Sequence, residues 1–320
     1  MAESVSARDV AVNGITLHVT ECGQGPLVLL CHGWPELAFS WRHQLPALAG
    51  AGFRAVAPDM RGYGRTTAPE AIDAYTILHL VGDMVALVGA LGETQAVIVG
   101  HDWGAPVAWT SAMLRPDVFR AVVGLSVPHR GRGPAPPLAS LRAAGVTRFY
   151  LQYFQEPGVA EAEFERDVAE TVRRILGAGG FGGGGSDDQV MMVPDSGFLS
   201  LVPRPEKLPP WLTEQDLTVW TENFARSGFR GGLNYYRNID RNFALTAPWQ
   251  GATIRQPALF IGGTHDVVLH PRFAGPALKA MPEQVPHLRG TVLLEGAGHW
   301  VQQERPEEVN RALIGFLQAL

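Results

Sequence analysis

The chain has 320 residues, of which 46% are hydrophobic and 18% charged, so it is long and apolar enough to bury a sizeable core. Its 31 acidic and 26 basic side chains give a net charge of −5, which argues against a nucleic-acid-binding surface. Two cysteines, Cys22 and Cys31, are too few for a disulfide scaffold and lack the spacing of a zinc site. No apolar run is long enough to cross a membrane and the first residues lack a signal-peptide pattern, so we expect a cytoplasmic protein.

The first 127 residues alternate between segments typical of strands and segments typical of helices. Residues 11–20 contain an Asn-Gly pair, which predicts a β-hairpin. Apolar residues three or four apart predict a helix over 75–91, and a second helix is expected over 104–114. Short apolar runs, as expected of strands buried on both faces, occupy residues 27–31, 54–58, 95–99 and 121–125. The alternation predicts a mostly parallel sheet flanked by helices.

This alternation is interrupted once and then resumes. Residues 128–137 (PHRGRGPAPP) have the composition of a loop, and residues 138–245 are expected to be mainly helical. Strands are again expected at 258–261 and 291–294, followed by a helix that starts near Pro306. The pattern predicts an α/β core domain of residues 1–130 and 250–320, with an inserted helical cap domain of residues 131–249.

A glycine tract, residues 177–185 (GAGGFGGGG), lies inside the predicted cap. A phosphate-binding loop would follow a strand and end in Lys-Ser or Lys-Thr, and this tract does neither. We therefore expect a flexible loop between two cap helices.

The segment 97–105 carries the clearest chemical signal in the chain. An apolar strand leads into Gly100-His101-Asp102-Trp103-Gly104 and then a helix, which is the pattern of a nucleophile elbow. Such a turn exposes one side chain at the carboxyl end of a sheet, and here that side chain is an aspartate. In isolation, Asp102 could equally be a helix N-cap.

Two further residues follow later strands in the order that a nucleophile, an acid and a histidine take in this kind of fold. Asp266 follows the strand at 258–261, and His299 follows the strand at 291–294. The carboxyl ends of strands are where ligands collect in open α/β sheets, so these side chains are expected to meet Asp102. His265 is the nearest alternative to His299 as the catalytic histidine, but it is adjacent to Asp266 and does not follow the last strand.

A loop after the first buried strand supplies candidate oxyanion donors. The segment His32-Gly33-Trp34-Pro35-Glu36 is a tight turn that could direct the Trp34 N–H at a developing oxyanion, with the Trp103 N–H as the second donor. His32 is expected to make a structural hydrogen bond within this loop. The turn at 58–64 (PDMRGYG) is also expected to be structural.

Taken together, HGWPE, PDMRGYG, GHDWGA, GGTHD and GAGHW resemble the α/β-hydrolase superfamily, and the aspartate elbow resembles its epoxide hydrolases and haloalkane dehalogenases. Segments 149–158 and 232–238 resemble the two cap tyrosine motifs of soluble epoxide hydrolases. That resemblance implies that Tyr150 and Tyr236 donate to the epoxide oxygen. Tyr153 and Tyr235 are the adjacent alternatives. We also expect three tryptophans to contact the substrate: Trp34, Trp103 and Trp300.

The resemblance implies an α/β-hydrolase fold and an epoxide hydrolase that makes a vicinal diol from a small-molecule epoxide. Asp102 would form a covalent ester, which water activated by His299 and Asp266 would hydrolyse. No metal or cofactor is needed for this chemistry. We expect no nucleic acid or membrane partner and a monomer or homodimer.

Two other functions stay open at this point. A haloalkane dehalogenase shares the aspartate, the histidine and the HDWG string, but position 34 is tryptophan where asparagine is expected, and two cap tyrosines suit an oxygen leaving group better. A non-catalytic ligand receptor on a hydrolase scaffold is disfavoured by the intact Asp102, Asp266 and His299 set.

Overall fold

A computed structural model describes residues 4–178 and 191–320. Within these residues, one eight-stranded sheet has the order β1-β2-β4-β3-β5-β6-β7-β8. β1 and β2 pair antiparallel, as do β2 and β4, and every later pair is parallel. The strands are β1 (Ser6–Val12), β2 (Ile15–Cys22), β3 (Leu27–Cys31), β4 (Arg54–Pro58), β5 (Ala96–His101), β6 (Phe119–Leu125), β7 (Ala258–Gly263) and β8 (Leu288–Leu294).

The central strands are buried on both faces, which explains their uninterrupted apolar sequence. All five residues of β3 are buried, and they alternate between two hydrophobic clusters. Leu29 belongs to the cluster that contains α2 and α3, and Leu30 to the one that contains α1 and α13. The helices of this three-layer core are α1 (Gln44–Gly50), α2 (Ile77–Ala90), α3 (Gly104–Leu114), α11 (Pro271–Gln284), α12 (Val301–Glu304) and α13 (Pro306–Gln318).

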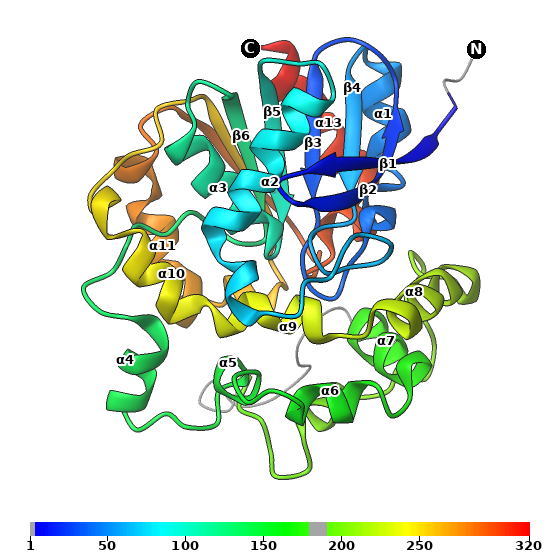
Figure 1. Ribbon diagram of the computed structural model, residues 1–320, viewed down its shortest axis with the longest axis vertical. Helices are drawn as coiled ribbons and strands as arrows, with labels where there is room; N and C mark the ends of the chain where they lie inside the picture. Colours follow the sequence, from blue (N-terminus) through cyan, green and yellow to red (C-terminus); the bar gives the residue numbers. More distant parts are fainter. Residues whose placement is uncertain (1–3, 179–190) are drawn as a thin grey trace.

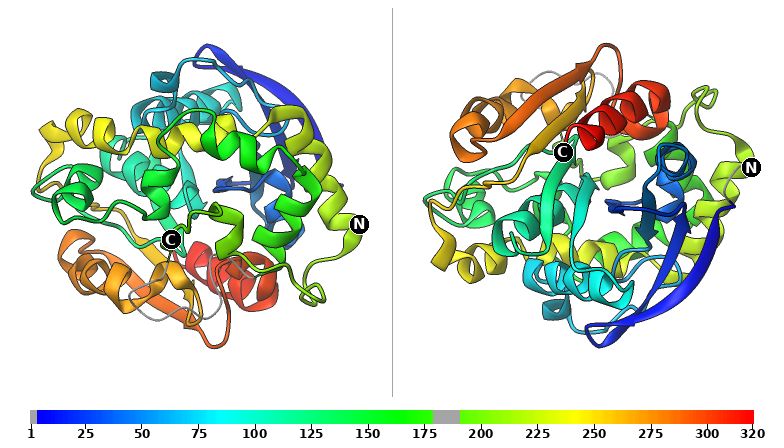
Figure 2. Two further views of the ribbon diagram at one scale, coloured as in Figure 1. Left: turned by 90° about the horizontal axis from the view of Figure 1, so that it is seen from below. Right: turned by 90° about the horizontal axis from the view of Figure 1, so that it is seen from above.

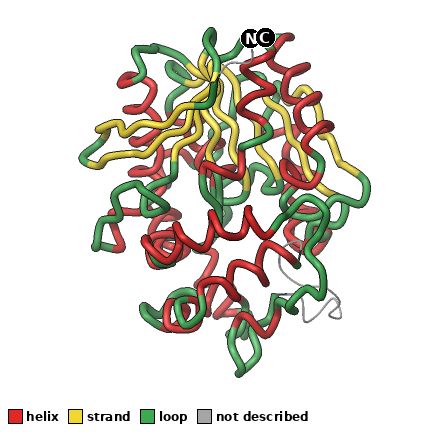
Figure 3. Tube along the Cα trace, turned by 90° about the vertical axis from the view of Figure 1, so that its right-hand side faces the viewer, coloured by secondary structure: helices red, strands yellow, loops and turns green. Residues whose placement is uncertain are grey.

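A helical layer lies beneath the sheet and comes from the chain between β6 and β7 (Figure 1). α9 and α10 lie directly below the core, and α4, α5 and α6 lie further away (Figure 1). Seen from below, these helices lie in front of the strands (Figure 2), and a side view shows them as a separate layer (Figure 3). They are α4 (Pro137–Ala143), α5 (Tyr150–Tyr153), α6 (Val159–Phe164), α7 (Val168–Gly177), α8 (Glu214–Ser227), α9 (Arg230–Arg237) and α10 (Ile239–Leu245).

The turn at 58–64 is where the core contacts α9. Gly62 has φ +84°, and a Cβ added to Gly231 would overlap the backbone of Gly62, so the two backbones can touch only because both residues are glycine. The Tyr235 hydroxyl donates to the carbonyl of Arg61 at 3.0 Å. The Arg61 guanidinium forms a buried ion pair with Asp83 of α2 at 2.6 Å. The structural role expected of this turn is confirmed.

The secondary structure agrees with the sequence prediction in kind and differs at the ends. The helix expected over 75–91 is α2 preceded by the short 3₁₀ helix η2 (Ile72–Tyr75), and the strands at 95–99 and 291–294 are longer than expected. The mostly parallel α/β sheet is confirmed, and the division into core and cap domains remains a prediction. Most of the glycine tract 177–185 lies outside the described residues. The remaining 3₁₀ helices are η1 (Ala38–Trp41), η3 (Phe198–Leu201), η4 (Ala247–Trp249) and η5 (Val267–Leu269).

Candidate active site

The turn between β5 and α3 presents Asp102 at the carboxyl end of the sheet. Asp102 has φ +48°, a left-handed conformation that non-glycine residues adopt rarely and at a cost in free energy. A Cβ on Gly100 would overlap the carbonyl of Gly104, and one on Gly104 would overlap the carbonyl of Cys31. The flanking glycines therefore allow the sharp turn, and the turn aims the Asp102 carboxylate away from the sheet.

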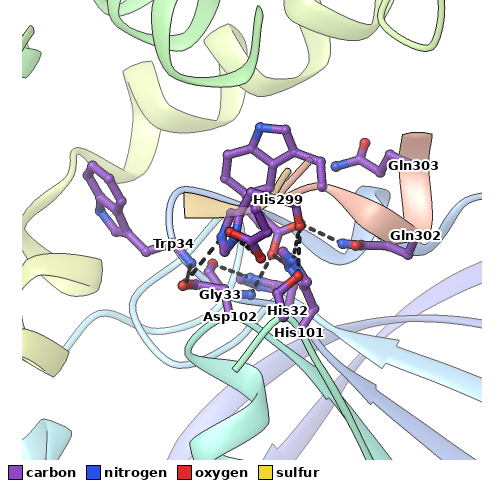
Figure 4. A network of polar contacts seen from close by, with 12 residues as sticks. His32, Gly33, Trp34, His101, Asp102, His299, Gln302 and Gln303 are labelled. Carbon is purple, nitrogen blue, oxygen red and sulfur yellow. Dashed lines mark hydrogen bonds and ion pairs between the residues drawn. The ribbon is translucent and has the colours of Figure 1, made fainter. Parts of the chain in front are cut away.

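Each oxygen of this carboxylate has its own neighbour. The backbone N–H of Trp34 donates to Asp102 Oδ1 at 2.7 Å, and Oδ2 lies 3.6 Å from His299 Nε2 (Figure 4). A Cβ at Gly33 would overlap the carboxylate, so only glycine permits the loop to approach this closely. The backbone N–H of Trp103, beside Asp102, makes no hydrogen bond within the described residues.

His299 lies between two carboxylates. Its Nδ1 is 3.0 Å from both oxygens of Asp266, which is buried and also accepts a hydrogen bond from the Val268 N–H at 2.9 Å. Burial of His299 opposes a charge on the ring, but the two carboxylates outweigh it and hold the pKa of His299 well above its usual range. The three residues that the sequence placed after separate strands therefore form one connected group.

The structure adds a buried pair that sequence analysis missed. His101 Nδ1 lies 2.6 Å from Glu36 Oε2, and His101 Nε2 lies 2.8 Å from the carbonyl oxygen of His299. Burial would raise the pKa of Glu36, but the interaction with His101 lowers it to about 2, so the carboxylate is ionised. The His101 ring therefore lies between two acceptors, the Glu36 carboxylate and the carbonyl oxygen of His299.

The Glu36–His101 pair connects the loop after β3, the elbow at Asp102 and the backbone of His299. Glu36 also accepts hydrogen bonds from the Gly33 N–H at 2.8 Å and from Gln302 Nε2 at 2.9 Å. The signal that could have identified the Glu36–His101 pair is the charged residue Glu36 directly after the apolar residues Trp34 and Pro35. His32 bonds to the Gly33 carbonyl and accepts from the Met60 N–H, which confirms its expected structural role.

Two tyrosines of the helical layer beneath the sheet lie near the aspartate. Tyr150 is the first residue of α5 and Tyr236 belongs to α9, and their ring centroids are 6.0 Å apart. Burial is the largest cause that raises the pKa of both phenols, and the charge of Asp102 raises them further. Both hydroxyls therefore carry their proton at neutral pH and can donate it.

The adjacent tyrosines have other partners. The Tyr153 hydroxyl donates to Glu163 Oε2 at 2.6 Å, and the Tyr235 hydroxyl donates to the Arg61 carbonyl. These bonds give both residues structural roles and point them away from the cavity that Asp102 lines.

A cavity of about 670 Å³ joins the aspartate to both tyrosines. Of the three tryptophans expected to contact substrate, only Trp103 lines it. Trp300 exposes none of its surface and packs on the ring of His299 at 4.7 Å, and the buried indole of Trp34 packs among other rings. The remaining lining is mostly apolar and comes from both layers: Pro106, Val127, Arg130, Pro137, Leu141, Val146, Phe149, Leu151, Met191, Met192, Ile239, Val268, Arg272 and Phe273.

No helix in residues 4–178 and 191–320 has the length and apolar character needed to cross a membrane. Nor do three or more His, Cys, Asp or Glu side chains of this described part come together in a way that could hold a metal ion.

Fold and site together define an α/β-hydrolase with aspartate at the nucleophile elbow. A family model described as the alpha/beta hydrolase fold matches residues 26–181. Epoxide hydrolase A of Mycobacterium tuberculosis is 47% identical over 98% of this chain and 97% of its own, and epoxide hydrolase 1 of Siraitia grosvenorii is 43% identical over 99% of both. The crystal structure of epoxide hydrolase A from Mycobacterium thermoresistibile is 48% identical, covers 98% of both chains and has a TM-score of 0.92.

The chain belongs to the epoxide hydrolases of the α/β-hydrolase fold. The expected enzyme class is confirmed, and the haloalkane dehalogenase and the non-catalytic receptor are set aside. Its substrate is accordingly a small-molecule epoxide.

Proposed function

We propose that this enzyme hydrolyses its epoxide through a covalent ester on Asp102. The observation that carries the proposal is the arrangement of one carboxylate: Oδ1 is held by the Trp34 N–H, Oδ2 faces His299, and the same cavity contains two protonated phenols. Each of these groups has a separate task in a two-step reaction.

The first step opens the ring. An ionised carboxylate is a competent nucleophile without prior deprotonation, unlike a serine hydroxyl. Because Oδ1 remains bonded to the Trp34 N–H, Oδ2 is the oxygen that attacks an epoxide carbon and forms the new C–O bond. The ring C–O bond breaks, and its electron pair stays on the departing oxygen.

Tyr150 and Tyr236 stabilise that oxygen. Both hydroxyls donate hydrogen bonds to it, and one phenol transfers its proton, which leaves a hydroxyalkyl ester and a tyrosinate. Acid assistance of this kind typically contributes ~10²–10⁴ in rate.

The second step depends on a change in charge. While Asp102 is ionised, His299 faces two carboxylates and holds a proton. Esterification removes the charge of Asp102 and leaves the ion pair with Asp266, so the pKa of His299 falls and the ring returns a proton to the tyrosinate. The neutral imidazole then takes a proton from water.

The resulting hydroxide attacks the carbonyl carbon of the Asp102 ester. The negative charge that develops on Oδ1 is stabilised by the N–H groups of Trp34 and Trp103. As the tetrahedral intermediate collapses, the C–Oδ2 bond breaks and the departing oxygen takes the proton of the added hydroxyl, which releases a vicinal diol, restores the carboxylate and leaves His299 protonated as at the start. The sum is epoxide plus water, and no other reactant is required.

Replacement of the base tests this scheme. His299→Gln should form the ester and fail to hydrolyse it, so the protein mass should rise by the full mass of the epoxide. His265→Gln is the matched control, because His265 is exposed, and it should turn over without a mass increase. An unmodified His299→Gln protein after incubation with substrate would contradict the ester scheme.

A further inference from the structure

The cavity beside Asp102 extends in one direction. Tyr236 lies between two tryptophan rings, with centroids 6.0 Å from Trp34 and 5.1 Å from Trp103. Trp103 lines the cavity and Trp34 does not. In Figure 4 the Trp34 indole points away from Asp102 and His299. The space for a substrate therefore lies on the Trp103 side of the nucleophile.

On the other side, four aromatic rings pack together, and we call them the aromatic plug: Trp34, Phe154, Phe164 and Phe198. The indole of Trp34 lies 5.2 Å from Phe154, 5.7 Å from Phe164 and 6.0 Å from Phe198. Phe154 lies 5.0 Å from Phe198, which closes the cluster. The plug joins the loop after β3 to α5, α6 and η3 of the cap layer.

Among the described residues, the four rings of the plug border no space that a ligand could use. A side chain on the wall of a cavity that admits even one water molecule would expose surface to it, and each of the four residues exposes 0%. The fit is also tight toward α9, because a Cβ at Gly232 would lie 2.6 Å from Trp34 Cδ1. Trp34 could therefore not move toward α9 without displacing that helix.

On the open side, the space continues beyond the first cavity. A second cavity of about 470 Å³ lies between α3 and α10 and includes Thr110, Met113 and Asn242 in its lining. Its other lining residues include six that also line the first cavity: Trp103, Pro106, Val127, Arg130, Pro137 and Ile239. The two cavities therefore adjoin on the Trp103 side of the nucleophile.

The two carbons of an epoxide carry their substituents at opposite ends of the C–C bond. We propose that this enzyme selects terminal epoxides, in which one ring carbon carries only hydrogen and faces the aromatic plug, while the substituent of the other carbon extends past Trp103. An epoxide with alkyl groups on both carbons would place one of them against the plug. The inference rests on the proposed function, because it assumes attack by Asp102.

Two isomers of the same formula test this selection in the wild-type enzyme: 1,2-epoxyoctane and trans-4,5-epoxyoctane. A hydrophobic pocket discriminates by ~10-fold or more when a single methylene is misplaced, and the internal isomer misplaces three carbons. We expect kcat/KM for diol formation to be at least about tenfold higher for the terminal isomer. Equal or faster turnover of the internal isomer would overturn the inference and leave the proposed function standing. No diol from either isomer would overturn both.

Removal of the plug gives a second test. In Trp34→Ala, which keeps the backbone N–H, the ratio of kcat/KM should shift toward the internal isomer by about tenfold or more. Phe316→Ala is the matched control, because Phe316 is a buried aromatic residue of α13 outside the site, and its ratio should equal that of the wild type. An unchanged ratio in a Trp34→Ala protein that melts cooperatively would contradict the inference. If that variant does not fold, the wild-type comparison decides.

Discussion

The two phenols at the cavity offer a prediction whose size follows from the structure. Tyr150→Phe and Tyr236→Phe each remove one hydroxyl and keep the ring. Because both rings pack against other aromatic rings, including each other, the substitutions should leave the shape of the site intact. The main loss is then the hydrogen bond that each hydroxyl forms to the departing oxygen.

The magnitude can be derived from the charge on that oxygen. A hydrogen bond to a charged group contributes ~1.5–3 kcal/mol, which corresponds to a loss of roughly 10–150-fold in rate for each single variant. The double variant removes both donors and the phenol proton, so we expect a loss on the order of 10²–10⁴ or more. The raised pKa of each phenol means that this loss should not change between pH 6 and pH 8.

Ester formation should be measured directly, by rapid quench of a single turnover and mass analysis of the protein. Tyr153→Phe and Tyr235→Phe are the matched controls, because their hydroxyls bond to Glu163 and to the Arg61 carbonyl, and they should form the ester at close to the wild-type rate. If the double variant of Tyr150 and Tyr236 also did so, the assignment of the oxygen donors would be refuted.

Two other predictions concern the reaction and the stability of the fold. Incubation with a styrene-oxide-like epoxide and with a haloalkane in parallel should yield diol from the first and no halide from the second; halide without diol would be the opposite result. Burial lowers the pKa of His129 from 6.5 to about 4, so the unfolded chain binds this proton first as the pH falls, and the fold should lose stability between those values. At 1.36 kcal/mol per pKa unit, this proton accounts for about 3 kcal/mol of the free energy of unfolding that is lost between pH 7 and pH 4. Chemical denaturation at the two pH values should therefore show a loss that is smaller by this amount in His129→Gln than in the wild type. Equal losses in the two proteins would disprove this account of His129.

The sequence alone was sufficient to predict the parts of the site that depend on local chain geometry. Asp102, Asp266 and His299 each follow a strand, and parallel strands end at one edge of a sheet, so their order along the chain predicted that they meet. The glycines around Asp102 are required by contacts within the same turn or with the neighbouring strand. The same pattern of glycines around the exposed residue is therefore expected in any chain that forms this turn.

Other parts depend on contacts between distant segments, which no local pattern reports. Glu163 decides whether Tyr150 or Tyr153 faces the cavity, because it accepts a hydrogen bond from the Tyr153 hydroxyl. Glu36 and His101 are 65 positions apart and meet only because β3 and β5 are neighbours in the sheet. The expectation that Trp34 and Trp300 contact substrate came from their positions next to site residues, and burial directs both indoles away from the cavity.

The covalent ester is the central claim, and the fate of the water oxygen tests it most directly. A single turnover in ¹⁸O-labelled water, with enzyme in excess over epoxide, should leave the label in the carboxylate of Asp102, because water attacks the ester carbonyl and the diol receives an oxygen that belonged to the enzyme. Mass analysis of the peptide that contains Asp102 would detect it. Label in the diol of the first turnover, with none in Asp102, would contradict the mechanism.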